Sequence, residues 1–433
     1  MSTFSRRSFL AGATAAVSTI ALTGPGRGAT NAPPIPAVRI GTVFPVKTGE
    51  GFIHASVNDF IGNGARMGAL LADRELARRA ADEGTRLDVL LSGSPSVDAA
   101  VRAGERLVET GNISALIGGV GEGQAEALAE IATAAKIPFF NIGETSDAFR
   151  RNSSRYVFHI EASDAMYLDA LGELAASLGY RRWAVVSEES DRGAEMAARI
   201  EQSAQKSDST ITGMVTVRPA QGVYFDEVEQ LAAIDADVVL VLVNFRDIFA
   251  LMVRMEEDGI TTPVLTFPDT IMQTRDFVAT ARYQLPTLSP RQRVALWETT
   301  NPDPEAERFN LGVRAEWAEP ADPTAWAAYA ATRIIFETVL ATRLTDPEAM
   351  IEHLENPETT FDVLKGPGVS FRPWDHQLRQ PLYVISVDQD VVWRQRQIDT
   401  RIAIARYEAT LPDGTPEGQS PQEWLDRLGD GPA

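Results

Sequence analysis

The chain has 433 residues, of which 44% are hydrophobic and 23% are charged, so length and composition predict a soluble protein of two domains with a packed core. Its formal net charge of -20 excludes a general role in binding nucleic acids or anionic membrane surfaces, because both need clustered Lys and Arg. The sequence has no cysteine, which excludes disulfides, thiolate metal ligands, thiol nucleophiles and lipid attachment through cysteine.

Residues 1–32 have the layout of an export signal. The paired Arg6 and Arg7 precede a charge-free apolar run from Ala11 to Leu22, and small residues follow this run. This order predicts a twin-arginine signal peptide that is cleaved within 29–33 and sends the folded protein to the periplasm. The apolar run is too short to predict a membrane span.

From residue 38 onward, apolar runs typical of strands alternate with helical patterns. The first set predicts strands at 38–44, 87–91, 115–118 and 137–142, with helices at 65–82, 97–109 and 123–135. The second set predicts helices at 163–178, 192–206, 225–234 and 246–257, with strands at 182–187, 211–217, 238–243 and 263–267. Strands separated by helices of this length form βαβ units. The predicted fold class is therefore α/β, with two successive parallel sheets that each have a core of their own.

The last third of the chain has a different pattern. Residues 282–323 are rich in Pro, Arg and acids and are predicted to be partly helical, and further helices are predicted at 326–344 and 347–355. Residues 369–371 and 382–387 are predicted to form two strands joined by a polar turn. In the tail after Leu411, which is rich in Pro, Gly and Asp, only 421–428 has a helical pattern.

Four stretches, in this order and spacing, resemble a known family. They are Arg39-Ile-Gly-Thr-Val-Phe-Pro, Ala115-Leu-Ile-Gly-Gly-Val-Gly-Glu-Gly, Ile137-Pro-Phe-Phe-Asn-Ile-Gly-Glu-Thr-Ser-Asp-Ala-Phe and Tyr156-Val-Phe-His-Ile-Glu-Ala-Ser-Asp-Ala. Over about 38–390 the chain resembles the type I periplasmic binding proteins of ABC transporters, in the branched-chain amino acid (Leu/Ile/Val) and amide branch.

This resemblance implies two Rossmann-like lobes joined by a hinge, with lobe 1 at 33–160 and lobe 2 at 161–290. Residues 291–390 are expected to return and complete lobe 1 and the hinge, and 391–433 to form a C-terminal extension. The implied function is the delivery of a small polar molecule, such as an amino acid, an amine, a polyol or an ion, to the membrane permease of an ABC transporter. We expect a monomer without enzymatic activity, cofactor or nucleic-acid partner.

The stretch from Phe371 to Pro381 suggests a narrower group. It resembles the end of binding proteins associated with PQQ-dependent alcohol dehydrogenase systems. The alternative function is therefore an accessory protein that holds a cofactor or metal for periplasmic alcohol oxidation. Within this stretch, Trp374, Asp375 and Arg379 are expected to serve packing and ion pairing.

The resemblance also implies site residues in lobe 1. In amino-acid-binding members, the loop after the third strand supplies a Ser or Thr to the ligand carboxylate, and this position falls at or beside Glu122, after Gly121. The next loop supplies backbone groups and a Thr hydroxyl, which fall on Gly143 and Thr145, with Glu144 between them. A desolvated carboxylate at position 122 would repel the α-carboxylate of an amino acid. Glu122 and Glu144 therefore indicate a cationic, amine-bearing or polyhydroxyl ligand or a metal ion, unless both are first-turn carboxylates that face solvent.

In lobe 2, Arg192 stands where relatives place an aromatic residue at the start of a helix. It is a candidate for binding an anion or for pairing with Glu122, and otherwise a surface arginine. Three further candidates follow predicted strands, where relatives present ligand contacts, and they are Asn244, Phe245 and Asp269. Phe44 and Lys47 end the first strand, and residues 47–63 are expected to form an enlarged loop. Within this loop Phe52 or Phe60 is a candidate for the wall of the site, and otherwise a core or lid aromatic without ligand contact.

Motifs of catalysis are scarce. The four histidines are dispersed without the spacing of a zinc site, and no Gly-x-Ser-x-Gly elbow is present. Gly119–Gly123 falls short of a dinucleotide fingerprint, because Gln124 replaces the last glycine and Glu122 would oppose a pyrophosphate. The sequence therefore predicts a binding protein and not an enzyme.

Overall fold

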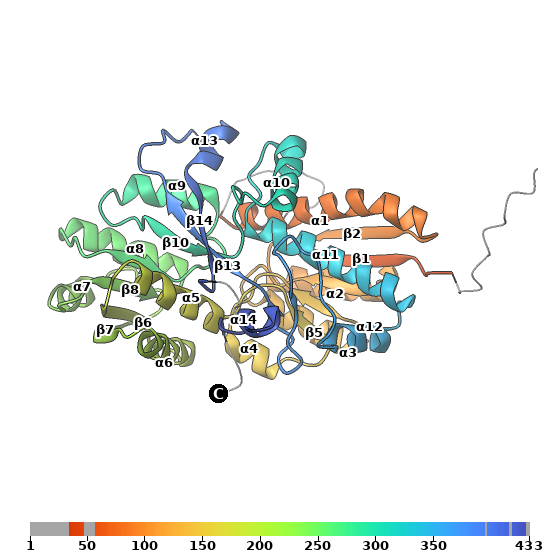
Figure 1. Cartoon of the computed structure of the whole chain (residues 1–433), viewed down its shortest axis with the longest axis horizontal. Helices are drawn as coiled ribbons and strands as arrows, with labels where there is room; N and C mark the ends of the chain where they lie inside the picture. Colours follow the sequence, from red (N-terminus) through yellow and green to blue (C-terminus); the bar gives the residue numbers. More distant parts are fainter. Residues whose placement is uncertain (1–33, 47–56, 395, 415–417, 430–433) are drawn as a thin grey trace, which may run out of the picture. The chain divides into compact units, whose positions relative to one another are not determined.

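Two parallel sheets organise the fold (Figure 1). The computed structural model describes residues 34–46, 57–394, 396–414 and 418–429. The predicted signal segment, Lys47 and Phe52 lie outside these described residues. Among the described residues, no helix has both the length and the apolar character of a membrane span.

The first sheet, which with its helices forms lobe 1, has the strand order β2-β1-β3-β4-β5, and all its strands are parallel. Almost every residue of β1 is buried, as expected for a parallel strand covered on both faces. The strands of lobe 1 are β1 Val38–Phe44, β2 Leu87–Gly93, β3 Ala115–Gly118, β4 Phe139–Asn141 and β5 Val157–His159. Its helices are α1 Val57–Asp82, α2 Val97–Gly111, α3 Gln124–Ala135 and α4 Asp147–Asn152.

The second sheet, in lobe 2, has the order β7-β6-β8-β9 and is also parallel throughout. Its strands are β6 Arg182–Glu188, β7 Thr210–Val217, β8 Val238–Leu242 and β9 Val264–Thr266. The helices of lobe 2 are α5 Asp164–Ser177, α6 Asp191–Lys206, α7 Phe225–Ala232, α8 Phe245–Glu257 and α9 Arg275–Gln284. The predicted α/β class with two parallel sheets is thus confirmed.

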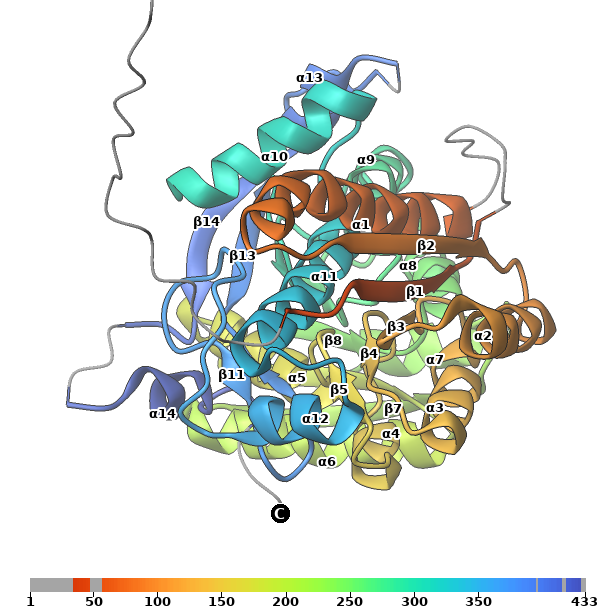
Figure 2. The same cartoon turned by 90° about the vertical axis from the view of Figure 1, so that its right-hand side faces the viewer.

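The rest of the chain passes back and forth between the lobes. It begins with β10 Gln292–Ala295, α10 Pro304–Trp317, α11 Pro323–Thr342 and α12 Pro347–Glu355. Helix α11 packs along α1 of lobe 1, as Figure 2 shows. After α12 the chain continues with β11 Ser370–Phe371, β12 Leu378–Arg379, β13 Leu382–Val387, α13 Ile398–Ala403, β14 Ala405–Leu411 and α14 Pro421–Leu425.

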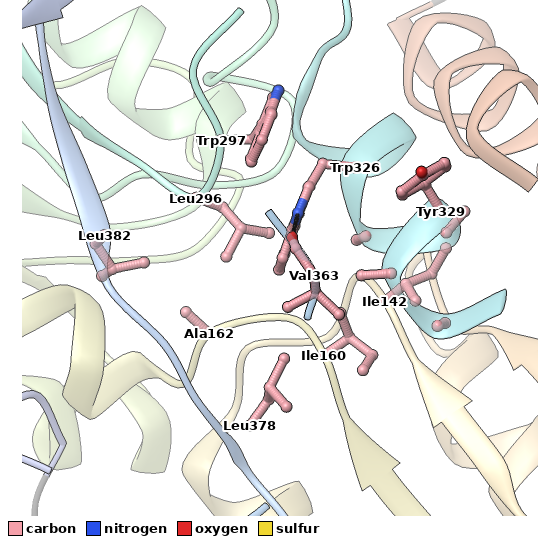
Figure 3. Close-up of a cluster of buried hydrophobic side chains, with 14 of the residues drawn as sticks. Ile142, Ile160, Ala162, Leu296, Trp297, Trp326, Tyr329, Val363, Leu378 and Leu382 are labelled. Atoms are coloured by element: carbon pink, nitrogen blue, oxygen red, sulfur yellow. Dashed lines mark hydrogen bonds between the residues drawn. The ribbon is translucent and has the colours of Figure 1, made fainter. Parts of the chain in front are cut away.

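The cores only partly match the prediction of one core per sheet. The outer faces do have separate cores, around Leu128 under α2 and α3 and around Met252 under α7 and α8. The inner faces share one continuous cluster, which runs from Phe140 of lobe 1 to Leu240 of lobe 2. Side chains from the crossing segments fill its middle (Figure 3). The lobes are therefore joined by apolar packing as well as by chain connections.

A stacked tryptophan pair lies within this shared core. The rings of Trp297, which follows β10, and Trp326, in α11, are parallel within 5° at a centroid separation of 5.7 Å. Both side chains are buried, and the indole nitrogen of Trp326 donates to the carbonyl of Val363 at 2.8 Å. The pair joins a crossing segment to a helix that packs on lobe 1.

Several boundary predictions were wrong. Helix α1 begins at Val57, although 47–63 was predicted to be an enlarged loop. Glycines at 62, 64 and 68 weaken the helical pattern, but Gly64 and Gly68 let α11 approach closely, because a Cβ at Gly68 would overlap the carbonyl of Ala325. The segments predicted to pair through a polar turn do not pair, since β11 pairs with β12 while β13 pairs with β10 and β14. Helices α4, α9 and α13 and strands β5, β10, β12 and β14 were not predicted.

Candidate functional site

The loop after β4 is folded by the side chain of Asn141, the last residue of that strand. Its Oδ1 accepts the backbone N–H groups of Gly143 (3.2 Å) and Glu144 (2.9 Å), and its Nδ2 donates to the carbonyl of Glu144 (2.7 Å). Gly143 packs on the loop after β3, where an added Cβ would lie 2.5 Å from the Cα of Val120. Glycine is required there for the close approach of two backbones.

A buried arginine supports the same loop. Arg150 in α4 donates to the carbonyls of Glu144 and Ser146, each at 3.1 Å, and to that of Glu161 at 2.7 Å. Its Nε donates to Oε1 of Gln377 at 2.6 Å. Burial lowers the pKa of Arg150, while neighbouring carboxylates, with Asp147 first, act in the opposite direction. These bonds connect the loop to the start of lobe 2 and to the segment before β12.

Arg192 connects the two lobes. It follows the Ser190 N-cap of α6, and its guanidinium binds Asp164 of α5 with Nε–Oδ2 2.8 Å and Nη2–Oδ1 2.7 Å. Nη2 also donates to Oγ1 of Thr145 in lobe 1 at 2.6 Å, and the guanidinium carbon lies 5.9 Å from the ring centroid of Phe267. Burial disfavours the charge, but the adjacent Asp164 carboxylate outweighs it and raises the pKa of Arg192.

Other bonds join the lobes at the same place. The hydroxyl of Thr270, in the loop after β9, donates to the carbonyl of Gly143 at 3.2 Å. The backbone N–H of Asp164 donates to the carbonyl of Thr145 at 2.8 Å. The loop after β4 therefore touches lobe 2 from two directions, through α5 and through the loop after β9.

Carboxylates surround this contact and outnumber the cation. Asp269 is partly buried, and the pKa of its carboxyl is raised, mainly by burial. The neighbouring Glu144 and Asp164 also raise this pKa, whereas Arg192 lowers it. Burial likewise raises the pKa of Glu126 in α3, and this carboxylate also interacts with Glu144 and Arg192. One guanidinium thus faces four carboxylates, which gives the region an excess of negative charge.

Asp147 in α4 adds a further titratable group. Its Oδ2 accepts the backbone N–H of Ala165 at 3.1 Å, which is another bond between lobe 1 and α5. Burial, and next the neighbouring Asp164, raise the pKa of Asp147 to about 6. The carboxyl is therefore partly protonated just below neutral pH.

A second polar group lies where the chain first crosses between the lobes. Oε1 of the buried Glu161 accepts the N–H of Ala162 at 3.0 Å and the hydroxyl of Tyr167 at 2.5 Å, and burial raises its pKa to about 7. Lys365 is also buried and donates to Oε1 of Gln380 at 2.8 Å, and burial lowers its pKa. These groups stiffen the crossing.

The structure brings together five of the residues that the sequence singled out. They are Gly143, Glu144, Thr145, Arg192 and Asp269. Arg192 forms an ion pair with Asp164 and donates to the hydroxyl of Thr145. Within the described part of the chain it does not form the candidate pair with Glu122. Glu122 is exposed in the loop after β3. The adjacent Gly121 packs against the side chain of Gln124.

The other candidates serve their own lobe. Asn244 caps α8 by accepting the N–H groups of Arg246 and Asp247, each at 3.1 Å, and its Nδ2 donates to Oε1 of Glu188 at 2.8 Å. Phe245 is half-buried and packs against both the shared core and the outer core of lobe 2. Phe44 is buried in the shared core, and Phe60 is half-buried in α1.

The expected structural role of the segment after β11 agrees with its contacts. Asp375 pairs with Arg372 at 2.8 Å, and Arg379 pairs with Asp426 at 2.8 Å. The two guanidinium groups lie over the ring of Trp374, at 5.7 and 5.4 Å from its centroid.

Sequence reasoning missed Asp164, Thr270, Phe267 and Arg150. Asp164 had a visible signal, because it stands in the first turn of a predicted helix directly after the first lobe. The described residues contain no group of three or more His, Asp or Glu side chains arranged to hold a metal ion.

Comparisons with known proteins agree with this architecture. A family model described as periplasmic binding protein matches residues 93–391. No curated protein sequence matches the chain at a significant level.

Similar solved structures share the fold at low identity. A branched-chain amino acid ABC transporter periplasmic ligand-binding protein from Burkholderia xenovorans matches with TM-score 0.70 at 16% identity, covering 86% of this chain and 95% of that one. LivJ from Streptococcus pneumoniae, a branched-chain amino acid transporter substrate binding protein in complex with isoleucine, matches with TM-score 0.66 at 17% identity, covering 86% and 99%. A solute binding protein of an ABC transporter from R. palustris, in complex with 4-hydroxybenzoate, matches with TM-score 0.66 at 16% identity, covering 88% and 99%. Together with the family match over most of the described residues, the two parallel sheets and their connections show that the chain belongs to the periplasmic binding protein family and has its type I fold.

Proposed function

We propose that the protein is the substrate-binding component of an ABC transporter, which binds a small polar molecule between its lobes in the periplasm and delivers it to the permease. The observation that carries this proposal is the meeting of the loop after β4 with Arg192 and Thr270 of lobe 2. In open α/β sheets, ligands bind beyond the carboxyl ends of the strands, and this meeting point lies there in both sheets. Family membership supports a binding protein rather than an enzyme.

The polar groups at this point suggest the chemistry of the ligand. In the described part of the chain, neither the backbone N–H of Thr145 nor Nη1 of Arg192 has an acceptor. Glu144 and Asp269 each accept one local backbone N–H, at 2.8 and 2.9 Å, through a single oxygen. The site therefore offers donors on one side and carboxylate oxygens on the other. A molecule that carries an amine together with acceptor oxygens, or several hydroxyl groups, would satisfy both.

A thermal-shift screen tests this proposal. The panel contains amino acids, amines, polyols, hydroxybenzoates and calcium, and a ligand at 100 times its Kd stabilises the native state by about 2.7 kcal/mol. We expect one amine-bearing or polyhydroxyl class to stabilise the protein and Asp269→Asn to reduce that shift. The matched control is Glu408→Gln, which removes an exposed carboxylate in β14.

Two results would contradict the proposal. One is a screen in which no small molecule changes the melting temperature or produces heat in calorimetry. The other is a stoichiometric metal or a chromophore in the purified protein, which would favour the accessory role in alcohol oxidation.

A further inference from the structure

The C-terminal segment packs across the junction between the lobes. We call residues 418–429 the C-terminal clasp; it contains α14, and its Leu425 and Leu428 are each 1% exposed. The family model ends at residue 391, so the clasp lies beyond the part of the chain that the family model matches.

One end of the clasp binds a hairpin that belongs to lobe 1. Strands β11 and β12 form this hairpin, and a bridge between Gln377 and His159 attaches it to β5. The ring of His376 stacks on that of Phe158 at 4.4 Å, and Phe371 meets Phe158 edge-on at 5.0 Å. The hairpin is therefore an extension of the first sheet.

The bonds between clasp and hairpin are close and mostly buried. Nε of Arg379 lies 2.8 and 2.9 Å from the two carboxylate oxygens of Asp426, and the Arg379 side chain is only 8% exposed. Arg372, also buried, donates to the carbonyl of Gly429. Because both arginines are buried, loss of a clasp partner would leave a guanidinium without its acceptor, which costs more than loss of a partner at an exposed ion pair.

The other side of the clasp binds α5 of lobe 2. The backbone N–H of Gly429 donates to Oδ2 of the buried Asp169 at 2.9 Å. Arg427 pairs with Glu173 at 3.2 Å, and Gly429 is packed so closely that an added Cβ would lie 2.7 Å from Cγ of Met166. Neighbouring residues of the clasp thus hold opposite lobes, with Asp426 bound to lobe 1 and Arg427 to lobe 2.

We propose that the C-terminal clasp ties the lobe 1 hairpin to α5 and favours the arrangement in which the loop after β4 touches lobe 2. A rotation of the lobes about their crossings would stretch or break the Asp426 or the Arg427 contact. The inference rests on the proposed function for its biological meaning. A protein that populates its binding-competent arrangement before the ligand arrives loses less affinity to the cost of closing. The clasp then sets both affinity and the ease of release to the permease.

The test measures the distance between the lobes without any ligand. Because the natural chain has no cysteine, Glu105→Cys on α2 and Glu229→Cys on α7 supply two labelling sites, both exposed, for spin-label distance measurements. Asp426→Asn and Arg427→Gln, singly and together, remove the ion pair that the clasp makes with each lobe, while the backbone bonds of Gly429 to Arg372 and Asp169 remain. Glu408→Gln is the matched control, because it removes an exposed carboxylate of the neighbouring β14.

Each single variant is expected to raise the ratio of displaced to original lobe distances about 2- to 5-fold, and the double variant by more. Unchanged distance distributions in the double variant, with protease cleavage showing that the clasp has been released, would overturn the proposal. If the double variant does not fold, the single variants give the same decision. Because the distance measurement uses no ligand, unchanged distances would contradict the role of the clasp but not the proposed function. A ligand screen without a hit would contradict the proposed function but not the role of the clasp.

Discussion

Two loops, one in each lobe, begin with asparagine at the carboxyl end of a parallel strand but use it differently. Asn141 ends β4 and folds the loop that reaches the other lobe, whereas Asn244 follows β8, caps α8 and binds Glu188 of its own lobe. The first arrangement leaves Thr145 in contact with Arg192 across the junction. The comparison shows that position at the carboxyl end of a strand does not make a residue available to a ligand. The groups that its side chain already binds within the protein decide whether it is available.

The largest expected effect comes from disturbing the loop after β4 where it packs most closely on the loop after β3. Gly143→Ala places a Cβ 2.5 Å from the Cα of Val120, so backbone must move, and we expect unfolding free energy to fall by about 3 kcal/mol. Urea unfolding followed by circular dichroism measures this change. The control is Gly222→Ala in lobe 2, where an added Cβ has nothing within 4 Å, so its cost comes only from the positive φ of 73°, which Gly143 does not share. A loss as small as that of the control would mean that the loops are not in close contact.

The next largest effect is expected from replacing Asn141, and comparison with the same replacement at Asn244 tests the difference between the two loops. Asn141→Ala leaves two partly buried backbone donors without their acceptor and should cost about 2 kcal/mol of unfolding free energy. Asn244→Ala removes an exposed helix cap and should cost about 1 kcal/mol. Binding of whichever compound the screen identifies should be lost in the Asn141 variant and kept in the Asn244 variant. Equal losses of binding would remove the distinction between the two loops.

The last test is a pH dependence that arises at Asp147, which begins α4 directly after the loop that follows β4. The pKa of Asp147 is raised from 3.8 to about 6, so the native state holds this proton more tightly than the unfolded chain. The group therefore stabilises least when ionised, and its contribution to stability falls as pH rises from about 4 to 6, by at most about 1.4 kcal/mol per pH unit. We expect the stability difference between wild type and Asp147→Asn to change over this window and to stay constant above it. A flat difference from pH 4 to 7 would show that the carboxyl is not perturbed.

Hydrophobic periodicity was enough to predict every strand of the two parallel sheets except β5, and most of their helices. It failed where tertiary packing overrides a weak local pattern, as in the first turns of α1, where Gly64 and Gly68 make room for α11. It also failed for β10, which has four residues and a partner, β13, far away in the sequence, and for β14, whose mixed polar and apolar residues form no apolar run. Such pairings cannot be read from a local pattern.

The candidate site was predictable to a similar extent. Thr145 and Arg192 were found through the resemblance to the family, and Asp269 because it follows a predicted strand where relatives present ligand contacts. Asp164 and Thr270 were missed because their contacts depend on how one lobe meets the other. Asn141 stood inside a quoted motif, but nothing in the sequence indicated that its amide would fold the loop after it.

The stacked Trp297 and Trp326 give this protein an optical reporter at its junction. Parallel indole rings at 5.7 Å couple their electronic transitions, and the strength of that coupling depends on the angle between the rings. One ring comes from a crossing segment and the other from a helix on lobe 1, so a lobe rotation that reorients them would change the ultraviolet circular dichroism of the unlabelled chain. A motion of the lobes can then be followed in the unlabelled protein in real time.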